Sequence, residues 1–180
     1  MLESLITSKT RVKLLMKLFL NPENKRHLRG MKKDFDESTN SVRLELNRFI
    51  DAGLLTDSFE QNRRYYKANT QHPLFGEIQN ILRKVVGIDR IVDTVTSRIG
   101  NLEVAYLTGS FAEGNDSDTV DLVLVGNNLD DAYIKELVAK AEGLIDRKII
   151  YLILTKEQMT HFFKDKPALL IWEKDEKTSG

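Results

Sequence analysis

The first 55 residues carry apolar positions at helical spacing, in three segments. Residues 8–20, SKTRVKLLMKLFL, follow a Ser or Thr N-cap and end at Asn21-Pro22. A short second helix fits residues 25–36, and a third fits residues 37–55, beginning at Ser38 or Thr39 and ending at Gly53. The inward positions of the first segment are Val12, Leu15, Leu18 and Phe19.

The third segment, ESTNSVRLELNRFIDAGLL, separates an apolar face from a polar one. Its inward positions are Val42, Leu46, Phe49 and Ile50. Its outward positions are Asn40, Ser41, Arg43, Asn47 and Arg48. Asn and Arg side chains on such a face are suited to reading base edges in the major groove of DNA.

Beyond Gly53 the period changes from helical to strand-like. LLTDSF and RRYYKAN are short strand patterns, and Glu60-Gln61-Asn62 between them fits a hairpin turn. Three helices followed by a hairpin predict a winged helix over residues 1–72. STNSVRLELNRFIDAGLL and the strands after it resemble the winged helix-turn-helix of ArsR-type transcription regulators, over about residues 5–70.

That resemblance implies double-stranded DNA as a partner. Base contacts are expected from Asn40, Ser41, Arg43 and Asn47, and phosphate contacts from Arg63, Arg64 and Lys67 in the wing. The alternative is structural: Asn40 and Ser41 cap the helix, and the wing arginines form a solvated edge that deters strand pairing.

A polar run ending at His72-Pro73 predicts a domain boundary near residue 72, with a second domain over 73–180. A helical stripe follows over residues 74–86, and its exposed part is suited to pairing two subunits, with ordinary core packing as the alternative. The stripe consists of Leu74, Phe75, Ile78, Ile81, Leu82 and Val85.

In the second half, strand patterns alternate with helical ones, which predicts an α/β domain. The strands are EVAYLT, VDLVLVG and RKIIYLIL; the helices include DDAYIKELVAKAEGL and KEQMTHFFKD, the latter with a capping box of Thr155 and Gln158. Trp172 is expected to anchor a core or an interface, and EKDEKTSG to form a mobile tail.

Within YLTGSFAEGNDSDTVDLVLVG, residues 106–126, Gly109, Ser110, Ala112 and Gly114 precede an acidic loop and an apolar strand. Residues 75–155 thereby resemble the minimal nucleotidyltransferase domains of the DNA polymerase beta superfamily. The resemblance implies two Mg²⁺ ions held by two carboxylates at i and i+2 on one strand, and a third on a later strand.

Asp121 aligns with the second carboxylate, but position 119 is a threonine and KIIYLIL offers no third carboxylate. Asp118 lies three residues before Asp121, so a regular strand points the two to opposite faces unless a β-bulge intervenes. A catalytically degenerate domain is therefore expected, with no cofactor. The alternative is an active Mg²⁺-dependent nucleotidyltransferase that uses Asp118 and Asp121.

Anion binding is the activity that this vestigial site, Gly109, Ser110, Asp118, Thr119 and Asp121, is able to keep. The backbone N–H groups of the Gly109-Ser110 turn suit a nucleotide or another anionic effector; a simple tight turn is the alternative. The domain then serves assembly or effector binding.

The charges of the chain cancel overall but differ between its halves. Residues 1–72 hold 14 Lys and Arg against 9 Asp and Glu, whereas residues 73–180 hold 13 against 18. A basic first half is suited to a polyanion. The chain contains no cysteine, which fits a reducing compartment. It has no run of about 20 apolar residues, the length needed to span a bilayer, and its start does not show the pattern of a signal peptide. We therefore expect a cytoplasmic DNA-binding regulator without a membrane partner. A third hypothesis is that the protein is an adaptor that binds only other proteins.

Overall fold

The computed structural model describes residues 2, 6–32, 34, 35 and 38–174. It divides into two compact units, Met1–Val85 and Val86–Gly180. The division falls later than the boundary expected near residue 72, because the helix that follows residue 72 packs on the first unit. The expected C-terminal tail lies outside the described residues from 175 onward.

Unit 1 begins with a helix that changes its pitch. Helix α2, Lys9–Leu15, is capped by the Ser8 side chain, which accepts from the Arg11 N–H, and continues as a π-helical turn η1, Met16–Leu20. Every residue of η1 is buried, and Lys17 within it pairs with Asp34 at 2.6 Å. The first helix expected from the sequence is thus confirmed.

The next segment differs from its expected form. Residues 26 and 27 form strand β1, Arg26–His27, and only Leu28–Lys32 form a helix, α3. The charged KRH triplet has no strand pattern of its own, so its extended form depends on pairing with the hairpin. Residues 33 and 36 of the predicted helix lie outside the described residues.

Helix α4, Thr39–Asp51, confirms the third predicted helix. Ser38 is its N-cap, accepting from the Ser41 N–H at 3.2 Å, and the chain turns at Gly53 with a φ of 71°. Val42, Leu46 and Phe49 are buried as expected, whereas Ile50 is half-buried.

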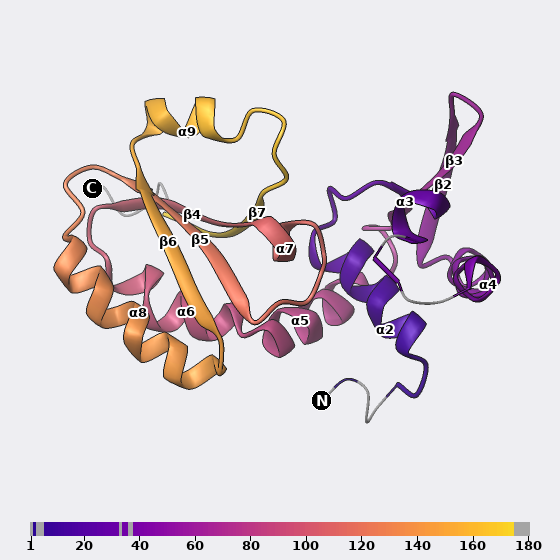
Figure 1. Ribbon diagram of the computed structural model, residues 1–180, viewed down its shortest axis with the longest axis horizontal. Helices are drawn as coiled ribbons and strands as arrows, with labels where there is room; N and C mark the ends of the chain where they lie inside the picture. Colours follow the sequence, from indigo (N-terminus) through magenta and orange to yellow (C-terminus); the bar gives the residue numbers. More distant parts are fainter. Residues whose placement is uncertain (1, 3–5, 33, 36–37, 175–180) are drawn as a thin grey trace. The chain divides into compact units, whose positions relative to one another are not determined.

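A three-stranded antiparallel sheet completes this part of unit 1 (Figure 1). Strands β2, Leu55–Glu60, and β3, Arg63–Ala68, are joined at Gln61 and Asn62, whose φ values of 46° and 61° fit a type I′ turn. β1 pairs with the other side of β3, giving the order β1-β3-β2. The hairpin expected from the sequence is confirmed.

Helix α5, Phe75–Val86, closes unit 1. The Phe75 ring stacks on Phe19 with centroids 6.0 Å apart, and the Gln79 amide donates to the carbonyls of Phe19 and Leu20 at 3.4 and 3.5 Å. Those carbonyls lie at the end of η1, so α5 satisfies acceptors that the helix end leaves open.

Unit 2 alternates strands and helices, as the sequence predicts for an α/β domain. Its sheet has the order β6-β5-β4-β7, with β5 and β6 parallel and the other pairs antiparallel. Its elements are α6 Ile88–Thr94, η2 Thr96–Arg98, β4 Leu102–Thr108, α7 Gly109–Ala112, β5 Thr119–Gly126, α8 Asp131–Ile145, β6 Lys148–Leu154, α9 Lys156–Phe162 and β7 Leu169–Glu173.

Helices cover both faces of this sheet (Figure 1). α6 and α8 pack together on one face, where α8 also contacts β6. On the other face, Val104, Val123 and Leu154 pack under apolar side chains of α9 and the turn after it, Met159, Phe162 and Phe163. Trp172, on β7 opposite Ala105, is half-buried. Among the described residues, no helix is both long and apolar enough to cross a bilayer.

Candidate nucleic-acid interface

Helix α4 presents polar side chains because its other face is fixed in the core of unit 1. Arg43 and Asn47 are exposed and stand four residues apart, one helical turn. Val42 and Leu46, on the core-facing side, are fully buried. The burial pattern therefore determines which side chains of α4 are available to a partner.

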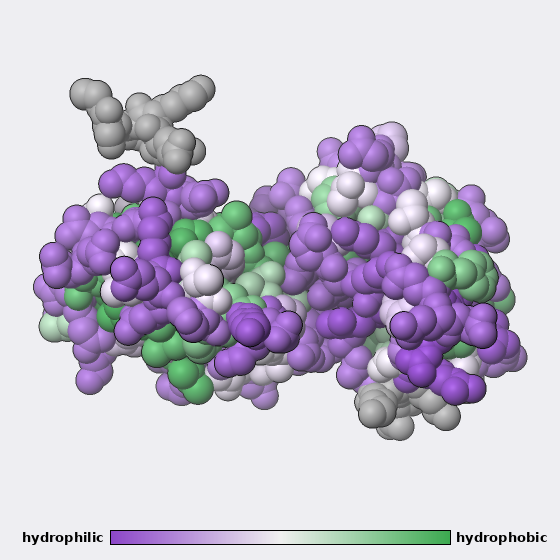
Figure 2. Space-filling view, turned by 90° about the horizontal axis from the view of Figure 1, so that it is seen from above, coloured by the Kyte–Doolittle hydropathy of each residue, from purple (hydrophilic) through white to green (hydrophobic). Residues whose placement is uncertain are grey.

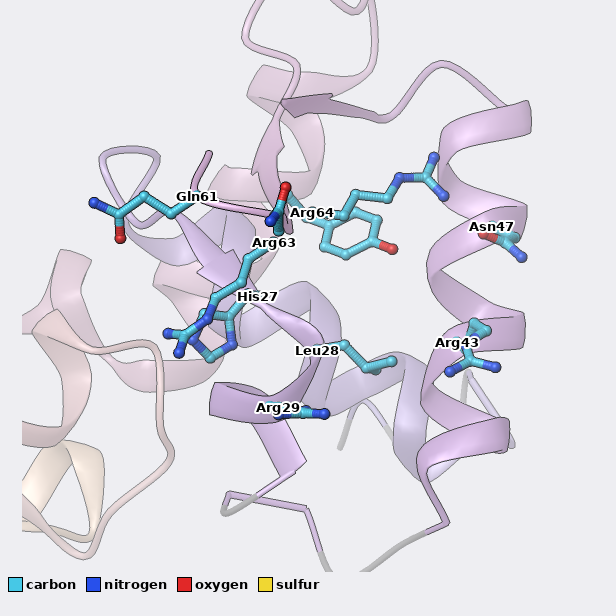
Figure 3. Close-up of a pocket in the computed structure, with 10 residues that line it drawn as sticks. His27, Leu28, Arg29, Arg43, Asn47, Gln61, Arg63 and Arg64 are labelled. Atoms are coloured by element: carbon cyan, nitrogen blue, oxygen red, sulfur yellow. The ribbon is translucent and has the colours of Figure 1, made fainter. Parts of the chain in front are cut away.

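A cavity of about 550 Å³ lies between α4, α3 and the hairpin (Figure 3). Among the described residues that line it, four are arginines and none is a carboxylate. The lining residues are His27, Leu28, Arg29, Arg43, Asn47, Gln61, Asn62, Arg63, Arg64 and Tyr66. Such a surface suits an extended anion. In a view from above, unit 1 also presents mainly hydrophilic residues (Figure 2).

The structure brings four of the seven predicted DNA-contact residues together at this cavity: Arg43, Asn47, Arg63 and Arg64. Ser41, half-buried, has its hydroxyl 3.4 Å from that of Thr10. Asn40 is exposed on the first turn of α4, outside the cavity lining.

Two of the predicted wing cations are engaged by carboxylates of unit 1. Lys67 pairs with Glu23 at 3.4 Å, and Arg64 pairs with Asp57 at 2.7 Å while lying 5.3 Å from the centre of the Tyr66 ring. The hydrogen bond to Asp57 holds the pKa of the Arg64 guanidinium above its ordinary value. Arg63, next to the turn, is exposed.

Sequence reasoning missed His27 and Arg29 as lining residues because KRHLRG was interpreted as one helix. The available signal was its cluster of basic residues just before a glycine. In the structure the backbone N–H of Gly30 donates to His27 Nδ1 at 2.8 Å. That bond assigns Nδ1 as the acceptor, leaving Nε2 as the ring nitrogen that carries a proton.

The residues predicted to form a vestigial site lie in unit 2 where β4 ends and β5 begins. Gly109 has a φ of 58°, and a Cβ there would collide with a carboxylate oxygen of Asp121. The Asp121 carboxylate therefore lies directly against the Gly109 turn. Thr108, the residue before that turn, is the cross-strand partner of Asp121.

Thr119 and Asp121 share one face of β5, since Val120 between them is buried on the other. The parallel register with β6 runs without a shift from Thr119 to Asp121, so no β-bulge brings Asp118 to their face. Asp118 precedes the strand, and its carbonyl accepts from the Lys148 N–H at 2.9 Å.

Asp116, in the loop before β5, is engaged by a cation. Asp116 pairs with Arg147 at 2.9 Å, and Arg147 also donates to the Ser117 carbonyl. The residue of β6 beside Asp121 is Ile150, which is 62% exposed. The described residues contain no cluster of three His, Cys, Asp or Glu suited to a metal ion.

No family model and no curated protein matches the sequence. Two solved toxin–antitoxin structures are similar to this chain. One, with AMP-PNP, is 17% identical to it in sequence, and the other, a mutant of the MntA–HpeT pair, is 15% identical. Each match covers 49% of this chain and 74% of the other chain, with a TM-score of 0.40. A candidate nucleotidyltransferase from Sulfolobus solfataricus is 22% identical over 52% of this chain and 84% of its own, with a TM-score of 0.37. At these values the likenesses decide neither fold nor function.

Replacement of Gly109 by Ala is expected to destabilise unit 2 by about 2 kcal/mol or more, since a positive φ and a collision with Asp121 act together. Thermal unfolding followed by the fluorescence of Trp172, the only tryptophan, measures the change. Gly143→Ala is the matched control: its Cβ meets open space within α8, so a gain of about 0.5–1 kcal/mol is expected. Equal stability of Gly109→Ala and the wild type would contradict the geometry.

Proposed function

We propose that this chain is a DNA-binding transcription regulator whose unit 1 contacts double-stranded DNA, and that unit 2 is a catalytically degenerate, nucleotidyltransferase-like domain. The observation that carries the proposal is the cavity between α4 and the hairpin, with its four arginines and no carboxylate among the described lining residues. The absence of cysteine supports a reducing cytoplasm as the compartment.

The order of elements in unit 1 supports a winged-helix interpretation of residues 1–72. Helices α3 and α4 precede a hairpin, and β1 adds a third strand beside β3. In winged helices the second helix of the pair enters the major groove while the hairpin follows the sugar–phosphate backbone. Helix α4 and the β2–β3 hairpin are the corresponding elements in this chain.

The contacts divide into two classes. Arg43 and Asn47 project from α4 and are proposed to reach base edges. Arg63, beside the hairpin turn, and Arg64, the next residue of β3, are proposed to bind phosphates. To bind phosphate oxygens, Arg64 must leave its ion pair with Asp57, and Lys67 its ion pair with Glu23. Their net contribution to the DNA-binding free energy is therefore expected to be smaller than that of Arg63. Asn40 and Ser41 remain predicted contacts at the start of α4.

For unit 2 the proposal is assembly or the binding of an anionic effector such as a nucleotide. Support for lost catalysis comes from β5, where the neighbour that shares a face with Asp121 is Thr119, and from β6, where Ile150 lies beside Asp121. A pair of divalent cations needs several carboxylates on one face. The rival enzyme, which uses Asp118, is disfavoured by the regular register of β5.

Arg63→Ala combined with Arg64→Ala should weaken binding to every DNA sequence and lower the salt slope of log K by about one to two. Fluorescence anisotropy with duplexes of several sequences at rising salt measures both. The control is Arg90→Ala with Arg98→Ala, which removes two exposed arginines of unit 2. A wing double mutant with wild-type affinity and slope would exclude the proposed phosphate contacts.

Arg43→Ala should reduce discrimination between a selected site and random DNA, by about 1–3 kcal/mol if the guanidinium reads a guanine. Selection of binding sites from a random duplex pool, followed by competition titrations, gives this difference. Leu44→Ala alters an exposed neighbour on α4 that cannot hydrogen-bond a base edge, and should leave discrimination nearly unchanged. An equal loss of affinity for specific and random DNA would show that Arg43 contacts phosphates and not a base.

Purified protein with Mg²⁺ or Mn²⁺ and a nucleoside triphosphate should show no nucleotidyl transfer. Thr119→Asp should raise Mn²⁺ affinity by recreating two carboxylates on one face of β5, without restoring turnover, because β6 still lacks a carboxylate. Electron paramagnetic resonance of free Mn²⁺ measures the binding.

Thr119→Asn is the neutral control for that variant, since it matches Asp in shape and should leave Mn²⁺ affinity low. Transfer activity in the unmodified protein that disappears on Asp118→Asn would establish the rival enzyme instead.

A further inference from the structure

Helix α5 carries a second apolar stripe beside the one that packs into unit 1. The inner stripe contains Phe75, stacked on Phe19, and Leu82, which is 1% exposed. On the outer stripe, Leu74, directly before α5, is 54% exposed and Ile81 is 49% exposed. Ile78 and Val85, half-buried, lie between and beyond them. We call the outer stripe, Leu74, Ile78, Ile81 and Val85, the α5 seam.

The spacing of the α5 seam is that of a coiled-coil interface. Its residues follow one another at intervals of four, three and four, which corresponds to heptad positions d, a, d and a. A single surface apolar residue needs no explanation, but a continuous seam of this period is what a second helix packs against.

The polar residues that flank the seam have opposite charges. Glu77 and Lys84 both occupy g positions, one heptad apart, and both are exposed. The e positions on the other flank are Phe75, which stacks on Phe19, and Leu82, which is buried. The available flank of the seam thus carries one negative and one positive charge.

We infer that the α5 seam binds the same seam of a second copy of this chain, with the two helices antiparallel. In this pairing Ile78 packs against Ile81 of the second copy, and Leu74 against its Val85. Antiparallel helices bring g positions together, so Glu77 faces Lys84 of the second copy. The two-fold axis repeats that ion pair, and the interface closes as a dimer.

The charge pattern is what selects a second copy and this direction. In a parallel pair, each g position meets the e position five residues later on the other helix, so Glu77 would face Leu82, and the position opposite Lys84 would lie beyond the end of α5 at Val86. Antiparallel self-pairing satisfies both charges with residues of this chain alone. A partner of another sequence is not required by any residue of the seam.

The size of the contact sets its expected strength. A single helix of 12 residues provides less buried area than a stable interface of about 1,200–2,000 Å². Self-association should therefore be reversible, with a dissociation constant on the order of micromolar. Under the proposed function, a two-fold dimer would bind DNA half-sites related by two-fold symmetry. Self-association itself rests only on α5 and is measured without DNA.

Sedimentation velocity of the full chain from about 1 to 100 μM measures the monomer–dimer equilibrium. Ile81→Ser should raise the dissociation constant at least about tenfold, because two-fold symmetry removes the side chain twice. Lys84→Glu should weaken the dimer about five- to tenfold by opposing like charges, and Glu77→Lys should do the same. The double variant with both exchanges should restore the wild-type value.

Leu144→Ser is the control for Ile81→Ser, since it replaces a 56% exposed leucine on a helix of unit 2. It should leave self-association unchanged. A chain that stays monomeric over the whole range, or a dimer that Ile81→Ser leaves intact, would overturn the inference. A dimer that Ile81→Ser weakens but the charge exchanges do not would overturn the antiparallel direction. None of these outcomes depends on whether the protein binds DNA.

Discussion

The buried ion pair between Glu45 and Arg11 sets the orientation of α4, on which the proposed DNA-contact surface depends. The Glu45 side chain is 8% exposed and accepts two hydrogen bonds from Arg11 of α2, at 3.0 and 3.2 Å. Arg48 adds a third at 2.8 Å. A buried carboxylate is costly without such partners, so rotation of α4 about its axis would leave Glu45 unpaired. The pair thereby keeps Arg43 and Asn47 directed at the cavity.

The same rule, that one face of an element is fixed by burial, decides what unit 2 is able to do. Leu122 and Leu124 of β5 are buried on one face of the sheet, which places Thr119, Asp121 and Val123 on the other. A one-residue shift of β5 would move its whole apolar set to the other face, so the strand keeps Thr119 and Asp121 on the same face as Val123. The core of unit 2 therefore determines which carboxylates are available to a cation.

Sequence reasoning predicted the parts of the fold that depend on local patterns. Ser38 as N-cap, the buried stripe of α4 and the turn at Gln61-Asn62 follow from spacing and turn chemistry alone. Strand β1 was missed because two residues carry no periodic signal, and its form depends on pairing with Tyr65 and Tyr66. Of the residues that line the cavity, sequence reasoning predicted only members of α4 and the wing as DNA contacts. His27 and Arg29 join the lining through tertiary packing, which a linear pattern does not encode.

A strand face with a single carboxylate has a consequence for stability as well as for chemistry. Two or three carboxylates on neighbouring strand positions repel one another unless a cation or shared proton neutralises them. In β5 and β6 the positions beside Asp121 are occupied by Thr119 and Ile150, which carry no charge. Asp121 rests instead against the Gly109 turn, where the absence of a Cβ makes room for its oxygen. On β5 and β6, Asp121 therefore has no second carboxylate to oppose it, and the turn at Gly109 accommodates its side chain.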